Sequence, residues 1–539
     1  MKVRSTRRRG RGFEGARDVA DRGGHRASSR RLLEMIAARI REKPTGRTLL
    51  AIVLGSASLL ALDGDVGIHD PSTIVVAGGK FYTYGTGGTS LVSDDGWTWR
   101  RGAALPLRQL APDVIHIGDR YYLYTAANSG QTKADVSMIW TKSLDPGSPD
   151  YKWSEPVVVA SSDGIEDANA IDPGILLDPT DSRLWLTYGS YFGYIRLVEM
   201  DPKTGKRLHP NEVPRNIAIN SEASVMIYHD GWYYLLVTHG SCCRGADSGY
   251  NIRVGRSKKV TGPFIDNIGV DMIQGGGKLF AGSGARVIGA GHFGLLDLGD
   301  GVQKFSLHYE ADLDRGGASV LDIRPLLWRD GWPVAGENAK EGTYQIESLR
   351  TGTVLELAVE GVPVGGRRTG RGGGPGGGRG GAPGAEGGRG GLFAGTGGVI
   401  PPQDPAAVSA AWPKGNLEPR MGNYMSQAQQ KWTITTVPGG GGYPGSPYFK
   451  IAIAGTDRTL AATAEGELVV VPAFSGAPEQ LWRLDQLADG SWRIMPKSVP
   501  NSVPGSKEPL SLSAVGSSFA TLAKFDPASE KQHWILKAP

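Results

Sequence analysis

The sequence has little cysteine and no long apolar run. Its 539 residues contain two cysteines, Cys242 and Cys243, which are adjacent, so a framework of disulfides between distant segments is excluded and the spacing fits no zinc site. The pair is compatible with a vicinal disulfide in an oxidising compartment or with two reduced thiols. The longest apolar run, residues 49–62, has 14 residues, fewer than the ~20 that a spanning helix needs.

Basic residues are concentrated in the N-terminal segment. The formal net charge is +5, but arginines cluster within residues 1–48, and the rest of the chain is close to balance. Because nucleic-acid binding needs a basic face on the folded part, we expect no nucleic-acid partner. The apolar run that follows predicts a signal peptide within a basic extension, residues 1–62, and export to the periplasm or outside the cell. A retained membrane anchor is the alternative, and translation could begin at Met35.

The composition favours an all-β chain. Glycine (80 residues) and proline (34) are abundant, and five turns are each followed by an aromatic-rich strand between residues 63 and 336. Counted from Phe81, Tyr121, Trp185, Tyr233 and Phe305, successive strands are separated by 40, 64, 48 and 72 residues. Such spacing is typical of four-stranded blades, and it predicts a five-bladed β-propeller over residues 63–336.

A polar residue precedes each aromatic strand by 8 to 13 positions: Asp70, Asp113, Asp172, Glu222 and His292. In a propeller the first strand of each blade lines the central channel, so these side chains are expected to converge on one axis. Asp-Pro is also a common turn dipeptide, which is the alternative for any single aspartate. We expect Asp113 to be structural. Two or three convergent carboxyl groups suit the general acid and base of glycoside hydrolysis.

Four motifs resemble glycoside hydrolase family 43, the arabinanase and arabinofuranosidase group. They are HDPS at 69–72, NAIDPGI at 169–175, SEAS at 221–224 and GAGHF at 289–293. Residues 241–266, double cysteine included, are similar to a stretch common in arabinan-active members. The likeness covers residues 65 to about 330, but Leu110 stands where the family has a tryptophan, and Tyr191-Phe192 replaces its Phe-Trp.

The resemblance implies a site for inverting hydrolysis. Asp70 would be the general base, Glu222 the general acid, and Asp172 the residue that orients the acid and tunes its pKa. Asn169 and Ser190 match positions that contact sugar in the family.

The resemblance also places His292 deep in the channel, where family members hold a metal ion, often calcium, or a water cluster. A histidine hydrogen-bonded within the core is the alternative.

The substrate implied by the resemblance is arabinan or a related plant cell-wall polysaccharide, cleaved at α-L-arabinofuranosidic linkages. Endo and exo action both stay open. A β-xylosidase or galactanase of the same family is an alternative, and so is a non-catalytic carbohydrate-binding protein. We expect a monomer, with no stable membrane insertion once the signal peptide is removed.

Three Gln-x-Trp tripeptides recur in the last part of the chain, at 430–432, 480–482 and 532–534. This threefold period resembles the ricin-type β-trefoil and predicts such a domain over 341–539. A Gly/Arg-rich stretch at about 361–400 reads as a disordered insertion, with an RNA-binding segment as the alternative. Where the lectin family has its sugar-binding aspartates, this chain has Glu356, Ala461 and Ser511, so sugar binding and a structural role both stay open.

Overall fold

The computed structural model describes residues 62–127, 132–163, 169–359, 408–499 and 509–539, all within one compact unit that spans Leu59–Pro539. The predicted signal segment, apart from Leu62, and the Gly/Arg-rich stretch lie outside the described residues. Among the residues described, no helix is both long and apolar enough to span a membrane.

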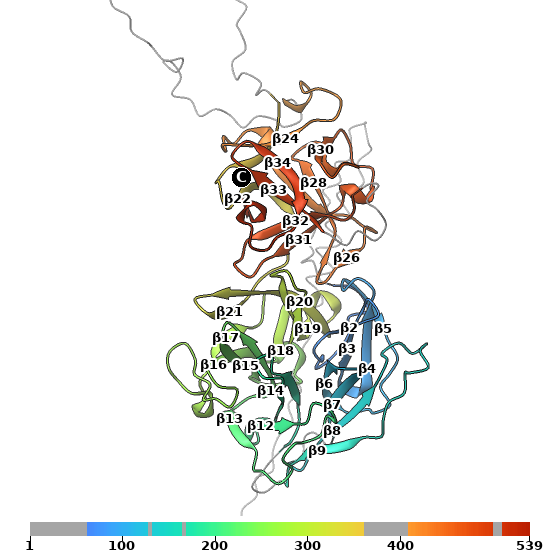
Figure 1. Cartoon of the computed structure of the whole chain (residues 1–539), viewed down its shortest axis with the longest axis vertical. Coiled ribbons are helices and arrows are strands. Elements are labelled where there is room, and N and C mark those ends of the chain that lie inside the picture. The colour runs from blue at the N-terminus through green and yellow to red at the C-terminus, as the bar shows by residue number, and fades with distance from the viewer. Residues whose placement is uncertain (1–61, 128–131, 164–168, 360–407, 500–508) are drawn as a thin grey trace, which may run out of the picture. The chain divides into compact units, whose positions relative to one another are not determined.

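Five antiparallel sheets follow one another from residue 63 to residue 335, and Figure 1 shows them grouped around a centre from blue to yellow-green. The first two sheets contain β2 (Val75–Ala77), β3 (Lys80–Gly85), β4 (Thr89–Ser93) and β5 (Thr98–Arg101), then β6 (Leu110–Ile117), β7 (Arg120–Ala127), β8 (Asp135–Thr141) and β9 (Val157–Ser161). The third contains β10 (Gly174–Leu177), β11 (Leu184–Tyr188), β12 (Tyr194–Met200) and β13 (Arg215–Ile219). The last two contain β14 (Glu222–His229), β15 (Trp232–His239), β16 (Asn251–Ser257) and β17 (Lys278–Ala281), then β18 (Val287–Asp297), β19 (Gln303–Asp312), β20 (Ala318–Arg329) and β21 (Trp332–Ala335). The prediction of a five-bladed propeller is confirmed.

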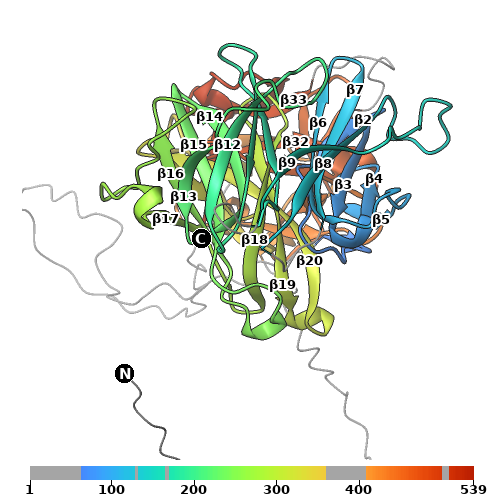
Figure 2. The same cartoon turned by 90° about the horizontal axis from the view of Figure 1, so that it is seen from below.

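The innermost strands of neighbouring sheets contact one another in order around the ring, from β2 and β6 through β10 and β14 to β18. The ring closes where the segment before β2 pairs with the last sheet: the N–H of Ile68 donates to Ser319 O (3.3 Å), and the N–H of Leu321 donates to Val66 O (2.9 Å). A short parallel strand, β1 (Asp63–Gly64), adds to the outer edge of the first sheet at β5. Figure 2 gives the same sheets from below.

The hydrophobic cores lie between adjacent sheets, because each strand alternates side chains between its two faces. Tyr122 and Tyr124 of the second sheet, for example, share a core with Leu184 and Leu186 of the third. Each blade therefore needs its neighbours in order to bury both of its faces.

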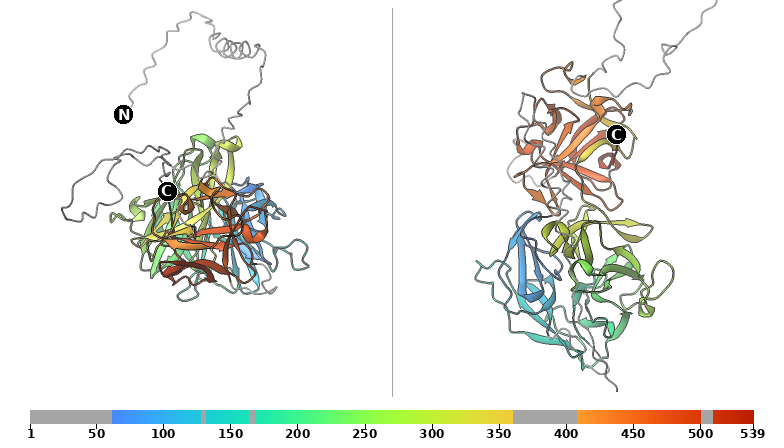
Figure 3. Two further views of the ribbon diagram at one scale, coloured as in Figure 1. Left: turned by 90° about the horizontal axis from the view of Figure 1, so that it is seen from above. Right: turned by 180° about the vertical axis from the view of Figure 1, so that it is seen from behind.

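A second all-β region follows the propeller (yellow, then orange and red, in Figure 3). Its strands are β22 (Gly342–Ser348), β23 (Val354–Leu357), β24 (Pro419–Gly422), β25 (Trp432–Thr436), β26 (Gly442–Tyr443), β27 (Ser446–Pro447), β28 (Phe449–Ile453), β29 (Thr459–Ala462), β30 (Leu468–Val471), β31 (Trp482–Gln486), β32 (Trp492–Pro496), β33 (Leu510–Val515), β34 (Phe519–Lys524) and β35 (Trp534–Lys537). All except β26 and β27 join one sheet of 12 strands.

The three Gln-x-Trp tripeptides make the same contacts in this region. Trp432, Trp482 and Trp534 are fully buried in one core. Their indole Nε1–H groups donate to the carbonyls of three leucines, 355, 460 and 512, over 2.8 to 2.9 Å. The glutamine two residues before each tryptophan accepts a backbone N–H from a preceding loop.

We expect Gly174→Ala to destabilise the propeller. A Cβ at Gly174 would lie 1.9 Å from the carbonyl oxygen of Ser224 in the next blade, and relieving such overpacking costs about 1–3 kcal/mol. The matched control is Gly415→Ala, because no atom lies within 4 Å of a Cβ at Gly415. Urea unfolding of both variants gives the comparison, and equal loss of stability would contradict the role assigned to Gly174.

Candidate active site

Each of the five blades has a residue with a left-handed backbone at a repeating place in or before its innermost strand, and Asn169 and Asn220 add a second such residue in the third and fourth blades. The φ angles are 50° at Asp70, 44° at Ala111, 52° at Asp172, 47° at Ala223 and 56° at His292. Such a conformation costs a non-glycine residue about 1–3 kcal/mol and is concentrated at functional sites. In the second, fourth and fifth sheets it coincides with a bulge in the innermost strand. The repeat brings Asp70, Asp172 and His292 to equivalent places, with Glu222 directly before its counterpart.

The same repeat corrects the expectation that Asp113 takes the place of Asp70 in the second blade. The residue equivalent to Asp70 there is Ala111. Asp113 is buried, and its carboxylate accepts N–H groups from Thr73 (3.0 Å), Val114 (2.9 Å) and Ile175 (3.0 Å). It thereby joins the innermost segments of three blades. Burial raises the pKa of Asp113 despite these hydrogen bonds. The expectation of a structural role agrees with these contacts.

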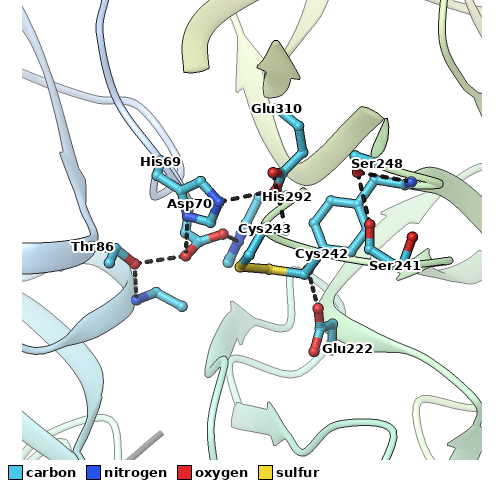
Figure 4. The surroundings of a disulfide bond; sticks show 12 residues. His69, Asp70, Thr86, Glu222, Ser241, Cys242, Cys243, Ser248, His292 and Glu310 are labelled. Carbon is cyan, nitrogen blue, oxygen red and sulfur yellow. Dashed lines mark hydrogen bonds and ion pairs between the residues drawn. A yellow bond between two sulfur atoms is a disulfide. The ribbon is translucent and has the colours of Figure 1, made fainter. Parts of the chain in front are cut away.

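Three polar side chains surround the carboxylate of Asp70 (Figure 4). Oδ2 lies 2.8 Å from Nδ1 of His69 and accepts the hydroxyl of Thr86 at 2.6 Å, and Oδ1 lies 3.4 Å from Nδ1 of His292. Burial alone would raise the pKa of Asp70, but the hydrogen bonds from His292 and His69 hold it well below its usual range. Asp70 is therefore ionised and can accept a proton.

His69 lies between two carboxylates. Its Nε2 lies 2.9 Å from Oε1 of Glu310, on β19, while Nδ1 faces Asp70. Burial acts to lower the pKa of His69, but the hydrogen bonds to Asp70 and Glu310 prevail and raise it to about 10. Burial also acts against ionisation of Glu310, yet its contacts with His308 and His69 lower its pKa to about 2. The cation His69 is thus held between two anions.

His308 is a neutral acceptor. Its Nδ1 accepts the backbone N–H of Asp70 at 3.0 Å, so the proton lies on Nε2, which is 3.5 Å from Oε1 of Glu310. Burial lowers the pKa of His308. The ring therefore fixes the backbone at Asp70 without contributing charge.

Glu222 and Asp172 favour the protonated state. Burial, and then the negative charge of Asp70, raise the pKa of Glu222 to about 7, against the hydrogen bond that the Tyr250 hydroxyl donates to it. Burial and the charges of Glu222 and Asp70 raise the pKa of Asp172 well above its usual range. Oδ2 of Asp172 accepts the N–H of Ala223 at 3.2 Å, next to Glu222. The site therefore combines an ionised carboxylate with a protonated carboxyl group.

Asn169 and Ser190, the two predicted sugar contacts, lie together. Both are buried, and the hydroxyl of Ser190 donates to the side-chain oxygen of Asn169. The carbonyl of Asn169 accepts the N–H of Ile171 at 2.9 Å, and the carbonyl of Ile171 accepts the N–H of Gly189 at 2.8 Å. The pair therefore shapes the segment that leads into Asp172, and sugar contact stays a prediction.

His292, the residue predicted to lie at a metal site in the channel, is buried. Nδ1 of its ring lies 3.4 Å from Oδ1 of Asp70, and its backbone N–H donates to Thr238 Oγ1 (3.0 Å). Within the described part of the chain, the clusters of three or more metal-ligating side chains involve His69 and do not include His292. Since Ca²⁺ takes six to eight oxygen ligands, calcium in the channel stays a prediction.

The structure adds five residues that the sequence analysis did not assign to the site: His69, Thr86, Tyr250, His308 and Glu310. His69 stood in the HDPS motif. His308 and Glu310 are buried polar residues on one face of an aromatic strand, a pattern that could have marked them. Thr86 and Tyr250 carried no such signal.

Of the two alternatives for the cysteines, the structure has the Cys242–Cys243 disulfide.

Comparison with known proteins gives one family and several relatives. The family model described as glycosyl hydrolases family 43 matches residues 73–333, a range that begins three residues after Asp70. An extracellular exo-α-(1→5)-L-arabinofuranosidase of Cellvibrio japonicus is 31% identical over 324 residues, which cover 54% of this chain and 92% of the relative. An extracellular endo-α-(1→5)-L-arabinanase of Bacillus subtilis is 30% identical over 291 residues, which cover 49% and 87%.

Solved structures include an exo-1,5-α-L-arabinanase from a bovine ruminal metagenomic library. It is 31% identical, covers 51% of this chain and 100% of its own, and has a TM-score of 0.47.

We expect Tyr250→Phe to raise the pKa of Glu222 above about 7, because the Tyr250 hydrogen bond favours the ionised carboxylate. Infrared titration of protein labelled with ¹³C at the glutamate carboxyl carbon measures this pKa, and Glu222→Gln identifies the band. Tyr194→Phe, a partly exposed tyrosine, is the control. A lowered or unchanged pKa in Tyr250→Phe would contradict the assigned contact.

Proposed function

This chain belongs to glycosyl hydrolase family 43, and we propose that it hydrolyses α-L-arabinofuranosidic linkages in arabinan with inversion of configuration. The observation that carries the proposal is the pair of carboxyl groups in different surroundings: Asp70 lies against His69, Thr86 and His292, whereas the buried Glu222 accepts the Tyr250 hydroxyl. These surroundings lower the pKa of Asp70 and raise that of Glu222. Hydrolysis by inversion needs such a base and acid on opposite faces of the sugar. The relatives at 30–31% identity, named for action on α-1,5-linked arabinofuranose, support this substrate class.

Each carboxyl group has a distinct task in the proposed mechanism. Glu222 donates its proton to the leaving glycosidic oxygen. Asp70 accepts a proton from the water that attacks the anomeric carbon, and His69 and Thr86 hold its carboxylate in one orientation. Asp172 fixes the backbone beside Glu222 through the N–H of Ala223, so we assign it the orienting role.

For the C-terminal region we propose a β-trefoil with a structural role. The threefold contacts of the Gln-x-Trp tripeptides support the fold. The one carboxylate kept at a lectin-like position is Glu356, which is buried and accepts hydrogen bonds from Arg420 Nε (2.8 Å) and Gln430 Nε2 (2.7 Å). Because those contacts occupy its oxygens, Glu356 supports packing better than sugar binding.

We also propose that the protein is exported and acts as a single chain. The basic segment followed by a 14-residue apolar run is typical of a signal peptide. Two relatives are named as extracellular enzymes.

Loss of either central carboxyl group should abolish most of the activity. We expect Asp70→Asn and Glu222→Gln each to lower kcat on linear arabinan by about 10²- to 10⁴-fold, the usual contribution of general acid or base catalysis. Asp119→Asn, at an exposed turn, is the matched control. Proton NMR of the first product anomer tests inversion. Full activity in both variants would refute the mechanism, while release of sugar from arabinoxylan or galactan alone would change the substrate class.

The pH dependence should be one-sided over the accessible range. Glu222 must be protonated, so kcat/KM is expected to fall as the pH rises through about 7, the raised pKa of this group. Asp70 must be ionised, and its lowered pKa keeps it so down to acidic pH, which leaves the acidic side flat. Rates on an aryl arabinofuranoside give the profile. A fall on the acidic side near pH 5, or none above pH 8, would be inconsistent with these states.

A further inference from the structure

The loop between β15 and β16 places a disulfide beside the site (Figure 4). Cys242 and Cys243 are adjacent in the chain, so their bond closes no loop of appreciable length and removes little entropy from the unfolded chain. It cannot stabilise the fold by joining distant segments. The bond instead restricts the local backbone, including the direction of the N–H of Cys243.

That N–H begins a series of hydrogen bonds that ends at Asp70. It donates to Oε2 of Glu310 over 3.0 Å, while Oε1 of Glu310 lies 2.9 Å from Nε2 of His69. Nδ1 of His69 in turn lies 2.8 Å from Oδ2 of Asp70. Because the carboxylate of Glu310 is planar, fixing one of its oxygens also orients the other, and with it the imidazole that faces Asp70.

The disulfide also lies directly against this series. Both sulfur atoms are within 4.8 Å of a ring nitrogen of His69 and a carboxylate oxygen of Glu310. Rotation of either cysteine side chain would therefore alter the space that the His69–Glu310 pair occupies.

The far end of the same loop contacts the acid. The hydroxyl of Tyr250 donates to Glu222. Ser241 ties the two ends of the loop together, since its carbonyl accepts the hydroxyl of Ser248 (2.8 Å) and the N–H of Gly249 (3.2 Å). One short loop thus touches the acid directly and the base through Glu310 and His69.

We propose that the Cys242–Cys243 disulfide is a positioning element for the base: by fixing the N–H of Cys243 on Glu310, it sets the orientation of His69 against Asp70. The proposal rests on the function proposed above, because the role of Asp70 as base comes from there. The disulfide acts through other residues in this scheme and need not touch the sugar.

Kinetics of four variants test the proposal: Cys242→Ala with Cys243→Ala, His69→Gln, the combination of all three changes, and Arg244→Ala as an exposed control on the same loop. We expect removal of the disulfide to lower kcat about 10- to 100-fold, as misplaced catalytic groups do, with little change in KM. The combined variant should be no slower than His69→Gln alone, because both changes break one series. Losses that multiply, or a raised KM with kcat unchanged, would overturn the proposal, and the latter would make the disulfide a sugar contact.

A measurement without substrate separates this proposal from the proposed function. In ¹⁵N NMR spectra of the full chain, the side-chain resonances of His69, identified by their loss in His69→Gln, report its two hydrogen bonds to carboxylates. We expect the Nε2 resonance to shift when the disulfide is removed and to be unchanged in Arg244→Ala. An unchanged Nε2 resonance without the disulfide would overturn the positioning role. A shifted resonance in a protein that hydrolyses no polysaccharide would leave that role in place and overturn the proposed function.

Discussion

The site depends on one cation, His69, which lies between two of the four carboxyl groups gathered there. His69 contacts Asp70 and Glu310 and carries its proton at neutral pH because both are anions. Asp172 and Glu222 have no such partner among the contacts described, and burial raises the pKa of both. Identical chemical groups therefore acquire opposite protonation states from their surroundings, which is the general way in which a base and an acid coexist at one pH.

The propeller supplies the backbone geometry that this arrangement needs. Left-handed residues recur in every blade, and each is unfavourable by itself. They persist because the innermost strands pack against their neighbours at close range, as the approach of Gly174 to Ser224 illustrates. The left-handed conformation recurs even where it presents no catalytic side chain. In the second blade it occurs at Ala111, and the nearby Asp113 joins three blades through its hydrogen bonds.

The sequence was sufficient to predict the propeller and the convergence of Asp70, Asp172, Glu222 and His292, because aromatic strands and polar residues repeat in phase. The same counting misaligned Asp113, since spacing along the chain cannot register the bulge at the start of β6.

Contacts between residues of the first and last blades could not be predicted from the sequence. His69 and Glu310 are 241 residues apart and meet only because the first and last blades join. The state of the cysteine pair also stayed open, since adjacency in sequence permits both a bond and free thiols.

Acid and base in this site are not independent, which limits how substitutions can be interpreted. The charge of Asp70 contributes to the raised pKa of Glu222. Replacing Asp70 by a neutral residue removes the base and also favours ionisation of the acid, so the loss of activity exceeds the contribution of the base alone. The loop that bears Cys243 and Tyr250 adds a second connection, because it contacts Glu310 and Glu222. The effects of substitutions near Asp70 and near Glu222 on the activation free energy should therefore not add. Only cycles of single and combined variants can separate them.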